Sequence, residues 1–440
     1  MKIAVIGGGL TGLVCAEKLS RRGKNNVTLI ESGSGFGGLA SGFRRENWEW
    51  SLDRVYHHVF SSDSDILDYA NEVGFNGFFF KSPTTSSLYH TKRGFRLLPI
   101  DTPLDLILFP LLNIFERIRS GVAILFLKLS PHLKLFEQTT TQSLMTSLMG
   151  KRAYEVLFGE VLRKKFGKYA GNILSGFIWA RVLKRTKNLG YPEGGFQVFI
   201  DHLVGVCRKN GVVLRTSFPV TRIYQERGSG RVIVEKESEN LGEFDMIVCT
   251  TPSQVAAKTL KEVLNDEEIN NLSKIKHLAA MNIILETNGK YFDTEYWVSN
   301  CVTKIPALVF VQHTNFIDKS HYGSNDILYI GEYIPETSPL WSMSKDDLVK
   351  MYMEKLEEIT GRKIELINSF HFKAKNSQPV FDREFIDIVP KFHTSNKRVF
   401  MANLDMTYPF DRGTNYAVLL GQKVAEILGD GNSNVAVEKH

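Results

Sequence analysis

A short apolar strand that runs into a glycine pattern is the sequence feature that most constrains the fold. Residues 2–6 are apolar after Lys2 and lead directly into Gly7-x-Gly9-x-x-Gly12. Residues 11–22 then place apolar side chains on one helical face, and residues 27–30 form a second apolar run. This order predicts a βαβ unit of about thirty residues with two parallel strands.

The glycines of this unit have distinct expected roles. Gly7 permits a tight turn, Gly9 lets the backbone approach a pyrophosphate, and Gly12 allows close helix packing. The free N–H groups at the helix start favour negative charge. Glu31 closes the second strand, 19 residues after Gly12 (31 − 12), where its carboxylate can accept hydrogen bonds from ribose hydroxyls. We therefore predict a dinucleotide site, with a purely structural glycine turn as the alternative.

A second glycine pair favours FAD over NAD. Gly37-Gly38 follows shortly after Glu31 and would let the chain pass close to the rest of an extended cofactor. The alternative is a flexible surface turn.

Further α/β elements lie far along the chain. We expect a helix over 196–209, strands over 212–214, 231–234, 246–249 and 398–401, and a last helix over 415–428. The intervening blocks have no βαβ rhythm and are rich in aromatic residues. The predicted fold is therefore α/β, with a discontinuous Rossmann-type FAD-binding domain over 1–60, 189–255 and 396–440. A mixed α+β substrate domain over 61–188 and 256–395 is inserted into it.

The glycine pattern, Glu31 and Gly37-Gly38 resemble the fingerprint of the superfamily of FAD-dependent amine oxidases, protoporphyrinogen oxidases and phytoene desaturases. Four later segments fit the same family pattern: Tyr191-Pro-Glu-Gly194-Gly195-Phe196, Pro219-Val220-Thr221-Arg222-Ile223, Asp245-Met-Ile-Val-Cys-Thr-Thr-Pro252, and Ala402-Asn403-Leu404-Asp405 to Gly413-Thr414-Asn415-Tyr416-Ala417. The resemblance covers most of the chain. It implies that the Val220 backbone contacts adenine and that the last segment completes the flavin site.

The closing segment departs from the family in two respects. Asn403-Leu404-Asp405 stands where the family has Gly-Asp, so a contact of Asp405 with the ribityl chain or a phosphate is open. The segment also has no cysteine, which favours non-covalent FAD. Asn415 and Ala417 begin a helix whose N-terminus could stabilise negative charge on reduced flavin. Simple capping of that helix is the alternative.

Two adjacent histidines are the candidate catalytic residues. His57 and His58 lie in an aromatic segment, residues 48–60, which in the superfamily returns toward the flavin. In a strand, adjacent side chains point to opposite sides, so at most one of them should face the cofactor. A neutral imidazole there could exchange a proton while the flavin exchanges hydride. Structural histidines are the alternative; metal ligation is less favoured, because no third ligand motif stands nearby.

Candidate substrate contacts are spread along the chain. They are Tyr191, His313, Asn315, Arg181, Arg185 and Arg412. His313 and Asn315 follow an apolar run and would cluster at a strand end, although surface turn chemistry explains them equally well.

The block after residue 100 combines apolar runs with basic residues. Residues 103–112 and 121–127 are apolar but too short to span a bilayer, and could serve as core, tunnel lining or interfacial anchors. A basic run follows, opposed locally by Glu155 and Glu160: Lys151, Arg152, Arg163, Lys164, Lys165, Lys168, Arg181, Lys184, Arg185 and Lys187. These cations could meet an anionic membrane surface, hold a substrate phosphate, or form a solvated helix face.

Charge and cysteine content bound the function classes. The net charge of +6 is too small for a nucleic-acid-binding surface. Cys15, Cys207, Cys249 and Cys301 are widely spaced, which indicates neither a metal site nor disulfides. The apolar run before Gly7 is too short for a signal peptide. We expect a cytoplasmic protein that could lie at the inner membrane surface.

The leading functional hypothesis is an FAD-dependent oxidoreductase. It would oxidise or desaturate a lipophilic or amine-like small molecule by hydride transfer to flavin N5. The alternative is a non-redox reaction, because residues 37–43 and the histidine segment also resemble flavin-dependent UDP-galactopyranose mutases, in which arginines bind a sugar diphosphate.

Overall fold

The N-terminal βαβ unit lies at the centre of a five-stranded parallel sheet. The computed structural model describes residues 1–21, 23, 25–237 and 239–429. The strand order is β10 (Val213–Arg215), β2 (Asn26–Ile30), β1 (Lys2–Ile6), β14 (Met246–Cys249) and β20 (Val399–Met401). Pairing is parallel throughout, so strands from the start, middle and end of the chain lie side by side.

Both faces of this sheet are covered, as the apolar character of β1 requires. Ile3 and Val5 pack into one core cluster, whereas Ala4 and Ile6 pack into a second. The first cluster includes side chains of α1 (Leu10–Arg21), α9 (Phe196–Lys209), α15 (Thr414–Gly429) and α2 (Ser64–Glu72). The second includes an antiparallel sheet of β11 (Arg222–Gln225), β12 (Val232–Lys236) and β13 (Glu239–Phe244), with α10 (Ser253–Thr259) and α11 (Asp266–Lys274).

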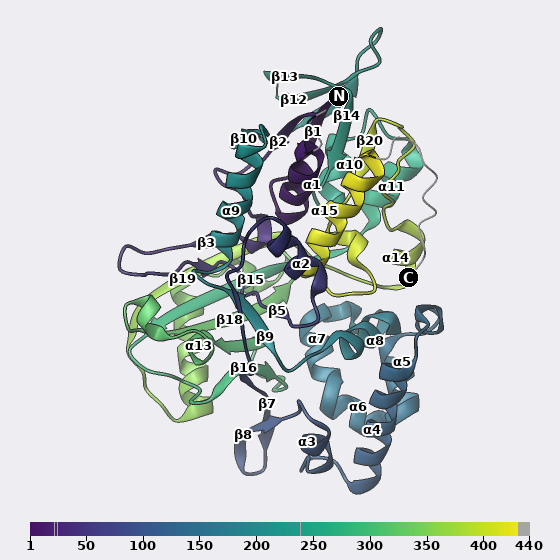
Figure 1. Ribbon diagram of the computed structural model, residues 1–440. Coiled ribbons are helices and arrows are strands. Elements are labelled where there is room, and N and C mark those ends of the chain that lie inside the picture. Colours follow the sequence, from purple (N-terminus) through teal and green to yellow (C-terminus); the bar gives the residue numbers. More distant parts are fainter. Residues whose placement is uncertain (22, 24, 238, 430–440) are drawn as a thin grey trace.

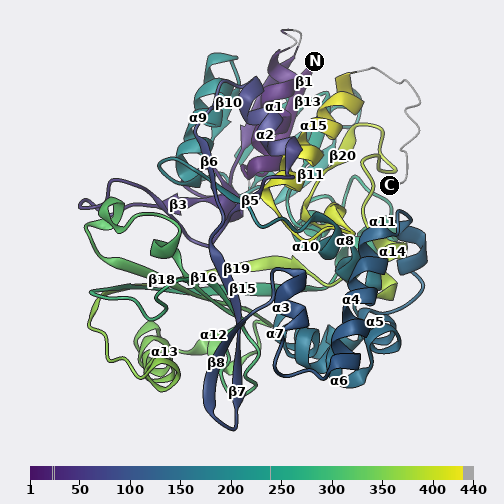
Figure 2. The ribbon, with the colours of Figure 1, turned by 60° about the horizontal axis from the view of Figure 1, so that its bottom comes forward.

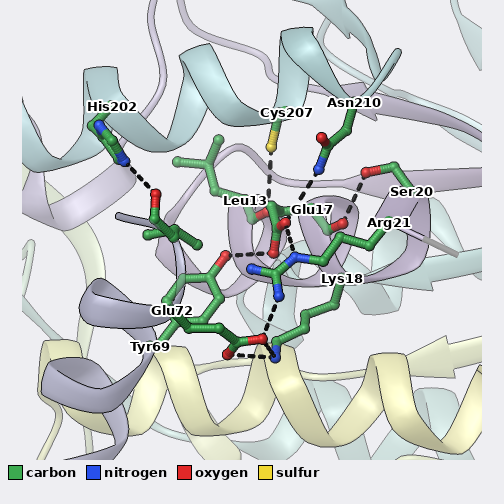
Figure 3. Close-up of polar contacts among 11 residues, drawn as sticks. Leu13, Glu17, Lys18, Ser20, Arg21, Tyr69, Glu72, His202, Cys207 and Asn210 are labelled. Carbon is green, nitrogen blue, oxygen red and sulfur yellow. Dashed lines mark hydrogen bonds and ion pairs between the residues drawn. The ribbon is translucent and has the colours of Figure 1, made fainter. Parts of the chain in front are cut away.

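A buried carboxylate joins the helices on the first face (Figure 3). Glu17 of α1 is fully buried and is paired with Arg21 one turn later. The Tyr69 hydroxyl of α2 donates to Glu17 Oε2 at 3.0 Å, and the Asn210 amide after α9 donates to Oε1 at 3.2 Å. Because each helix contributes one donor, Glu17 fixes the spacing of all three.

We expect Glu17→Ala to lower the free energy of unfolding by about 3 kcal/mol, because it leaves three donors of a buried network without an acceptor. Glu72→Ala is the matched control. Glu72 also pairs with Arg21 and with Lys18 but is 38% exposed, so its loss should cost about 1 kcal/mol or less. Urea unfolding of the two variants measures the difference, and equal losses would contradict a dominant role for the buried network.

A second, seven-stranded sheet lies beside the first unit (Figures 1 and 2). Its strand order is β19 (Leu366–Pro379), β15 (His277–Thr287), β18 (Asp326–Ile334), β17 (Val309–Gln312), β16 (Glu295–Asn300), β7 (Thr84–Thr91) and β8 (Gly94–Pro99). β16 pairs with β7 in parallel, and the remaining pairs are antiparallel. α13 (Lys345–Thr360) packs on this sheet through a third core cluster. The sheet therefore combines strands from both of the blocks that separate the Rossmann segments.

Residues 103–184 form a helical unit at the other side of the second sheet (Figures 1 and 2). Its helices are α3 (Pro103–Ile107), α4 (Ile114–Leu129), α5 (Thr141–Met149), α6 (Lys151–Tyr154), α7 (Glu160–Phe166) and α8 (Ser175–Lys184), with a π-helical turn over Glu155–Gly159. Among the described residues, none of the helices is both long and apolar enough to cross a membrane.

Short elements connect the three units. β5 (Val59–Phe60), β9 (Leu189–Pro192) and β6 (Phe78–Lys81) form a small antiparallel sheet, and β3 (Gly42–Phe43) pairs with β4 (Leu52–Asp53). The remaining helices are α12 (Pro339–Ser342) and α14 (Arg383–Ile388).

The predicted α/β class is confirmed, and one local expectation is wrong. Residues 54–58 form an irregular segment rather than a strand. Of the alternatives for the apolar runs over 103–112 and 121–127, core packing accounts for only part of the residues, because Leu104, Leu108 and Leu125 are more than half exposed. Helical periodicity alone does not say whether an apolar stripe points inward or outward.

Candidate functional site

The glycine turn between β1 and α1 has the geometry of a phosphate-binding loop. Gly7 has φ +111°, and a Cβ at Gly12 would overlap the Gly7 carbonyl oxygen. Both positions thus need glycine for the protein's own packing. Gly9 differs, because a Cβ there would meet only the Gly38 Cα, at an ordinary 4.0 Å. The open space in front of Gly9 fits the close approach of a pyrophosphate to the backbone.

Glu31 holds the two glycine segments together. Its Oε2 accepts a hydrogen bond from the Gly8 N–H at 2.7 Å, and its Oε1 accepts one from the Gly33 N–H at 2.7 Å. The Gly37 N–H in turn donates to the Gly8 carbonyl oxygen at 2.8 Å. Gly37 (φ +120°) and Gly38 (φ +56°) therefore lie against Gly8 and Gly9. The Ser32 hydroxyl also donates to Oε1, so the second acceptor position of Oε2 stays available for a ribose hydroxyl and the loop fits a dinucleotide.

Asp405 of the closing segment, which we predicted to contact the cofactor, has hydrogen-bond partners within the protein. Asp405 is fully buried; it accepts hydrogen bonds from Ser253 and lies 2.6 Å from His277 Nε2. This network ties the closing segment to α10 and β15 and gives Asp405 a structural role, whereas its contact with the cofactor stays a prediction.

Asn415, Ala417 and Val220 also occupy defined positions. Asn415 accepts a hydrogen bond from the Ile66 N–H at 3.0 Å and donates to Asp65 at 2.7 Å, so it anchors the start of α2. Ala417 lies partly buried in the first turn of α15. Val220 lies just before β11 and packs partly buried against the second core cluster. Asn415 therefore joins the N-terminus of α15 to that of α2. Because α15 also packs against α1, the three helices lie on the same side of the sheet (Figure 1).

His57 and His58 diverge although they do not lie in a strand. The His57 ring lies 5.7 Å from Phe196 of α9, whereas the His58 ring lies 5.6 Å from Trp297 of β16. Burial lowers the pKa of His57 to about 3 and that of His58 to about 4, and nearby arginine cations add to both shifts. Within the described chain, the Nδ1 atom of each ring has no hydrogen-bond partner. Both imidazoles are therefore neutral at physiological pH and free to make a further polar contact.

An aromatic wall stands next to these histidines. Tyr191 is fully buried, and its hydroxyl donates to Asp53 Oδ2 at 3.1 Å; burial raises the pKa of Asp53 well above its ordinary value. The ring of His313 packs 5.5 Å from Tyr191, and burial lowers the pKa of His313 to about 3. The Asn315 amide donates to the Phe292 and Glu295 carbonyl oxygens at 2.9 and 2.8 Å, which makes it a turn residue.

Arg181 and a lysine converge on one carboxylate, and Arg412 follows that carboxylate directly in the chain. Asp411 lies 2.5 Å from Arg181 and 3.0 Å from the buried Lys165. Arg412 donates to the Tyr333 hydroxyl at 3.0 Å, and the Tyr333 ring also lies 4.7 Å from the Lys165 ammonium. Burial alone would raise the pKa of Asp411, but Lys165 and Arg181 lower it to about 2. We call Lys165, Arg181, Arg412 and Asp411 the cationic cluster.

Arg185 and the rest of the basic run have other partners. Arg185 pairs with Asp101 at 2.6 Å, Arg163 with Glu155 at 2.7 Å, and Arg152 with Glu116. Asp101 and Glu116, which are distant in sequence, therefore neutralise part of the basic run. Within the run itself the chain has only Glu155 and Glu160. In the sequence Lys165 is one of ten cations, and nothing local separates it from the others or marks Asp411 and Tyr333. Among the described residues, no group of acids, histidines and cysteines is placed to hold a metal ion.

Glu332, next to Tyr333 on β18, gives a pH-dependent prediction. It is 4% exposed, and burial raises the pKa of its carboxyl group to about 8, although Lys164 opposes the shift. A pKa raised in the folded state stabilises the protein fully below the unfolded-state pKa, and this contribution is lost as the pH rises through the folded-state value. The parent should therefore lose stability between pH 5 and pH 8, whereas Glu332→Gln should not lose this contribution. We expect the free energy of unfolding of the variant, relative to that of the parent, to rise by roughly 3 kcal/mol between these two pH values. Urea unfolding at both pH values measures this; a difference independent of pH would contradict it.

The parallel sheet, the glycine turn and the carboxylate at the end of β2 together define a dinucleotide-binding protein. The family model described as flavin containing amine oxidoreductase matches residues 10–382, and the chain belongs to that family. The family implies a flavin cofactor, FAD, which the open loop in front of Gly9 fits. Among curated protein sequences, none matches the chain.

Solved structures share the whole fold. A protein from Exiguobacterium sp. 255-15 described as a protoporphyrinogen oxidase is 16% identical, with 98% of this chain and 99% of that chain covered and a TM-score of 0.77. Cyclohexylamine oxidase from Brevibacterium oxydans IH-35A is 10% identical, with 98% of each chain covered and a TM-score of 0.73. Reduced UDP-galactopyranose mutase is 14% identical, with 98% of this chain and 96% of that chain covered and a TM-score of 0.74. At these identities the likeness shows the fold.

Proposed function

We propose that this flavoprotein oxidises or desaturates a lipophilic small molecule that carries an anionic group. The cationic cluster is the observation that carries this proposal. Three cations, Lys165, Arg181 and Arg412, surround the single carboxylate of Asp411, which leaves a surplus of two positive charges. Arginine side chains bind carboxylates and phosphates through paired hydrogen bonds. A protonated amine would be repelled, so the cluster favours the lipophilic substrate class over the amine-like one.

The surroundings of the histidines support an apolar reaction site. The Tyr56 ring lies 5.1 Å from Trp297 and 6.2 Å from Tyr329, and the His58 ring lies 5.6 Å from Trp297. Aromatic walls exclude water and hold an apolar substrate in a fixed orientation. The Arg412 cation acts on His57 electrostatically, which supports a site shared by the cationic cluster and the histidines. His57 and His58, neutral and with a free Nδ1, are our candidates to hold or accept a substrate proton.

Bound FAD would accept a hydride at N5 and so supply the redox chemistry. We propose that it is bound non-covalently, because Cys15, Cys207 and Cys249 are buried in the core and the closing segment has no cysteine. Heat or acid should release all of the flavin into the supernatant, whereas flavin that stays with the precipitate would contradict non-covalent binding.

Anaerobic flavin bleaching tests the function. The holoprotein is mixed with long-chain alkyl or isoprenoid phosphates, with the corresponding carboxylates, and with amines of the same chain. Stoichiometric bleaching by an anionic compound, with none by its amine, is the expected result. Bleaching by amines alone would overturn the anionic substrate and retain the oxidoreductase.

A non-redox mutase is the second candidate, because the same cationic cluster also suits a sugar diphosphate. Arg181 and Arg412 would then bind the diphosphate, while Arg185 already pairs with Asp101. UDP-galactopyranose that is converted only after reduction of the flavin, with no bleaching by lipophilic compounds, would favour this candidate.

A further inference from the structure

Exposed apolar side chains gather on α3, α4 and the short segments that follow each of them. Of the eighteen exposed large hydrophobic residues in the described chain, eleven fall between residues 104 and 135. They are Leu104, Ile107, Leu108, Ile114, Phe115, Ile118, Val122, Leu125, Phe126, Leu129 and Leu135. We call them the apolar face. Soluble proteins rarely expose apolar patches of this kind unless they bind a partner or a membrane.

The apolar face arises because α4 buries mainly small residues and exposes its large apolar ones. α4 buries the small residues Ser120 and Ala123 together with Leu127, whereas Phe115 and Leu129 on its other side are 75% and 71% exposed. A helix that only completes a protein core turns its large apolar side chains inward. The direction of α4 is fixed by packing against α5 and α8 and by Arg117, which donates to the Leu112 and Ile107 carbonyl oxygens. The outward stripe is therefore a property of the folded unit.

The charges around the apolar face favour an anionic partner. Residues 103–152 contain six Lys and Arg against three Asp and Glu. Two of the acids are engaged in helix capping, Asp105 with Thr102 and Glu116 with Asn113, and Glu116 also pairs with Arg152. Lys128 and Lys134 are exposed beside the apolar face, and Arg119 donates to backbone carbonyl oxygens and so keeps its charge uncompensated.

We propose that α3 and α4 dock the protein on an anionic lipid leaflet. The apolar face would insert below the headgroups, with Lys128, Lys134 and Arg119 at the lipid phosphates. A symmetric contact with a second copy is less suitable, because a twofold interface would bring the two basic rims against each other. The helical unit lies at the periphery of the molecule in both views (Figures 1 and 2), and the side chains of the apolar face are exposed. α8, which packs on α4, carries Arg181, so a lipid-bound substrate would enter beside the cationic cluster.

Vesicle co-sedimentation of the full-length holoprotein tests this proposal independently of any activity. The parent should bind vesicles of phosphatidylcholine mixed with phosphatidylglycerol, bind less to phosphatidylcholine alone, and dissociate as salt is added. Phe115→Ser/Val122→Ser should weaken binding by about a hundredfold. Both side chains are exposed, so flavin content and thermal melting should match the parent. Val213→Ser/Ile367→Ser, at exposed positions outside the apolar face, is the matched control and should bind like the parent.

Charge reversal separates the electrostatic contribution to membrane binding from the insertion of the apolar face. Lys128→Glu/Lys134→Glu should lower binding to the anionic vesicles about tenfold and leave the weak binding to phosphatidylcholine unchanged. Failure of the parent to bind anionic vesicles would overturn the proposal, as would equal binding of the parent and the Phe115→Ser/Val122→Ser variant. A concentration-dependent dimer that this variant abolishes, without vesicle binding, would replace the leaflet by a second copy of the chain.

Discussion

Replacing Gly9 by alanine is expected to give a folded protein that has lost its flavin. The added methyl group has room within the protein, since its nearest neighbour would be the Gly38 Cα at 4.0 Å. It would, however, stand at the helix N-terminus where the pyrophosphate has to approach the backbone. We expect FAD to bind at least about a hundredfold more weakly, which corresponds to about 3 kcal/mol. The flavin-to-protein absorbance ratio measures retention, and reconstitution with FAD measures affinity.

Two other glycine-to-alanine substitutions serve as controls for Gly9→Ala. Gly205→Ala adds the same methyl group to α9, where a Cβ meets nothing within 4 Å, and should retain flavin while gaining up to about 1 kcal/mol of stability. Gly12→Ala should impair folding itself, because its Cβ overlaps the Gly7 carbonyl oxygen. Full flavin retention by Gly9→Ala would contradict the placement of the pyrophosphate at this turn.

Replacing Arg412 by glutamine is expected to lower kcat/KM for the anionic substrate by about a hundredfold, or about 2.7 kcal/mol. Arg412 is half-buried and held by Tyr333, so its guanidinium is already oriented and would lose little entropy on binding an anion. Lysine at this position keeps the charge but not the planar fork, and should recover part of the loss. The rate of anaerobic flavin bleaching provides the measurement.

The control for this prediction is Arg163→Gln. Arg163 lies in the same basic run but is about half exposed and pairs with Glu155 and Glu160, so its loss should leave the rate unchanged. Inorganic pyrophosphate should slow bleaching in the parent and do so about tenfold less effectively in Arg412→Gln. Equal inhibition of both proteins by pyrophosphate would assign Arg412 a structural role.

Much of the Rossmann unit could be predicted because its signals are local. A helix over 196–209 and a strand over 246–249 form with the predicted bounds. The glycine turn forms at the predicted place, and its positive φ at Gly7 explains why glycine is needed there. The strand over 2–6 also has its predicted bounds, whereas β2, β10 and β20 shift by one residue at one end or both, as expected where strand ends depend on pairing. The His57 segment was harder to predict, because its aromatic composition resembles a strand while its backbone is irregular.

The candidate site depended more on contacts between distant residues. The meeting of Lys165 with Asp411, 246 positions apart (411 − 165), follows from α7 lying near the turn before α15, and neither local sequence indicates it. Asp405 was expected near the cofactor, but His277 and Ser253 reach it from elsewhere in the fold and bond its carboxylate. Charge pairing acts over a few ångströms in space and leaves no periodic pattern in the chain.

The sequence by itself therefore determined the dinucleotide loop, because the backbone conformation of glycines and the order of strand, turn and helix are local properties. Tertiary structure decided which cations gather around one carboxylate and which face of α4 points outward. An amphipathic period defines an apolar stripe but not its direction, and only the packing of Ser120 and Ala123 against neighbouring helices turned the large side chains toward the solvent.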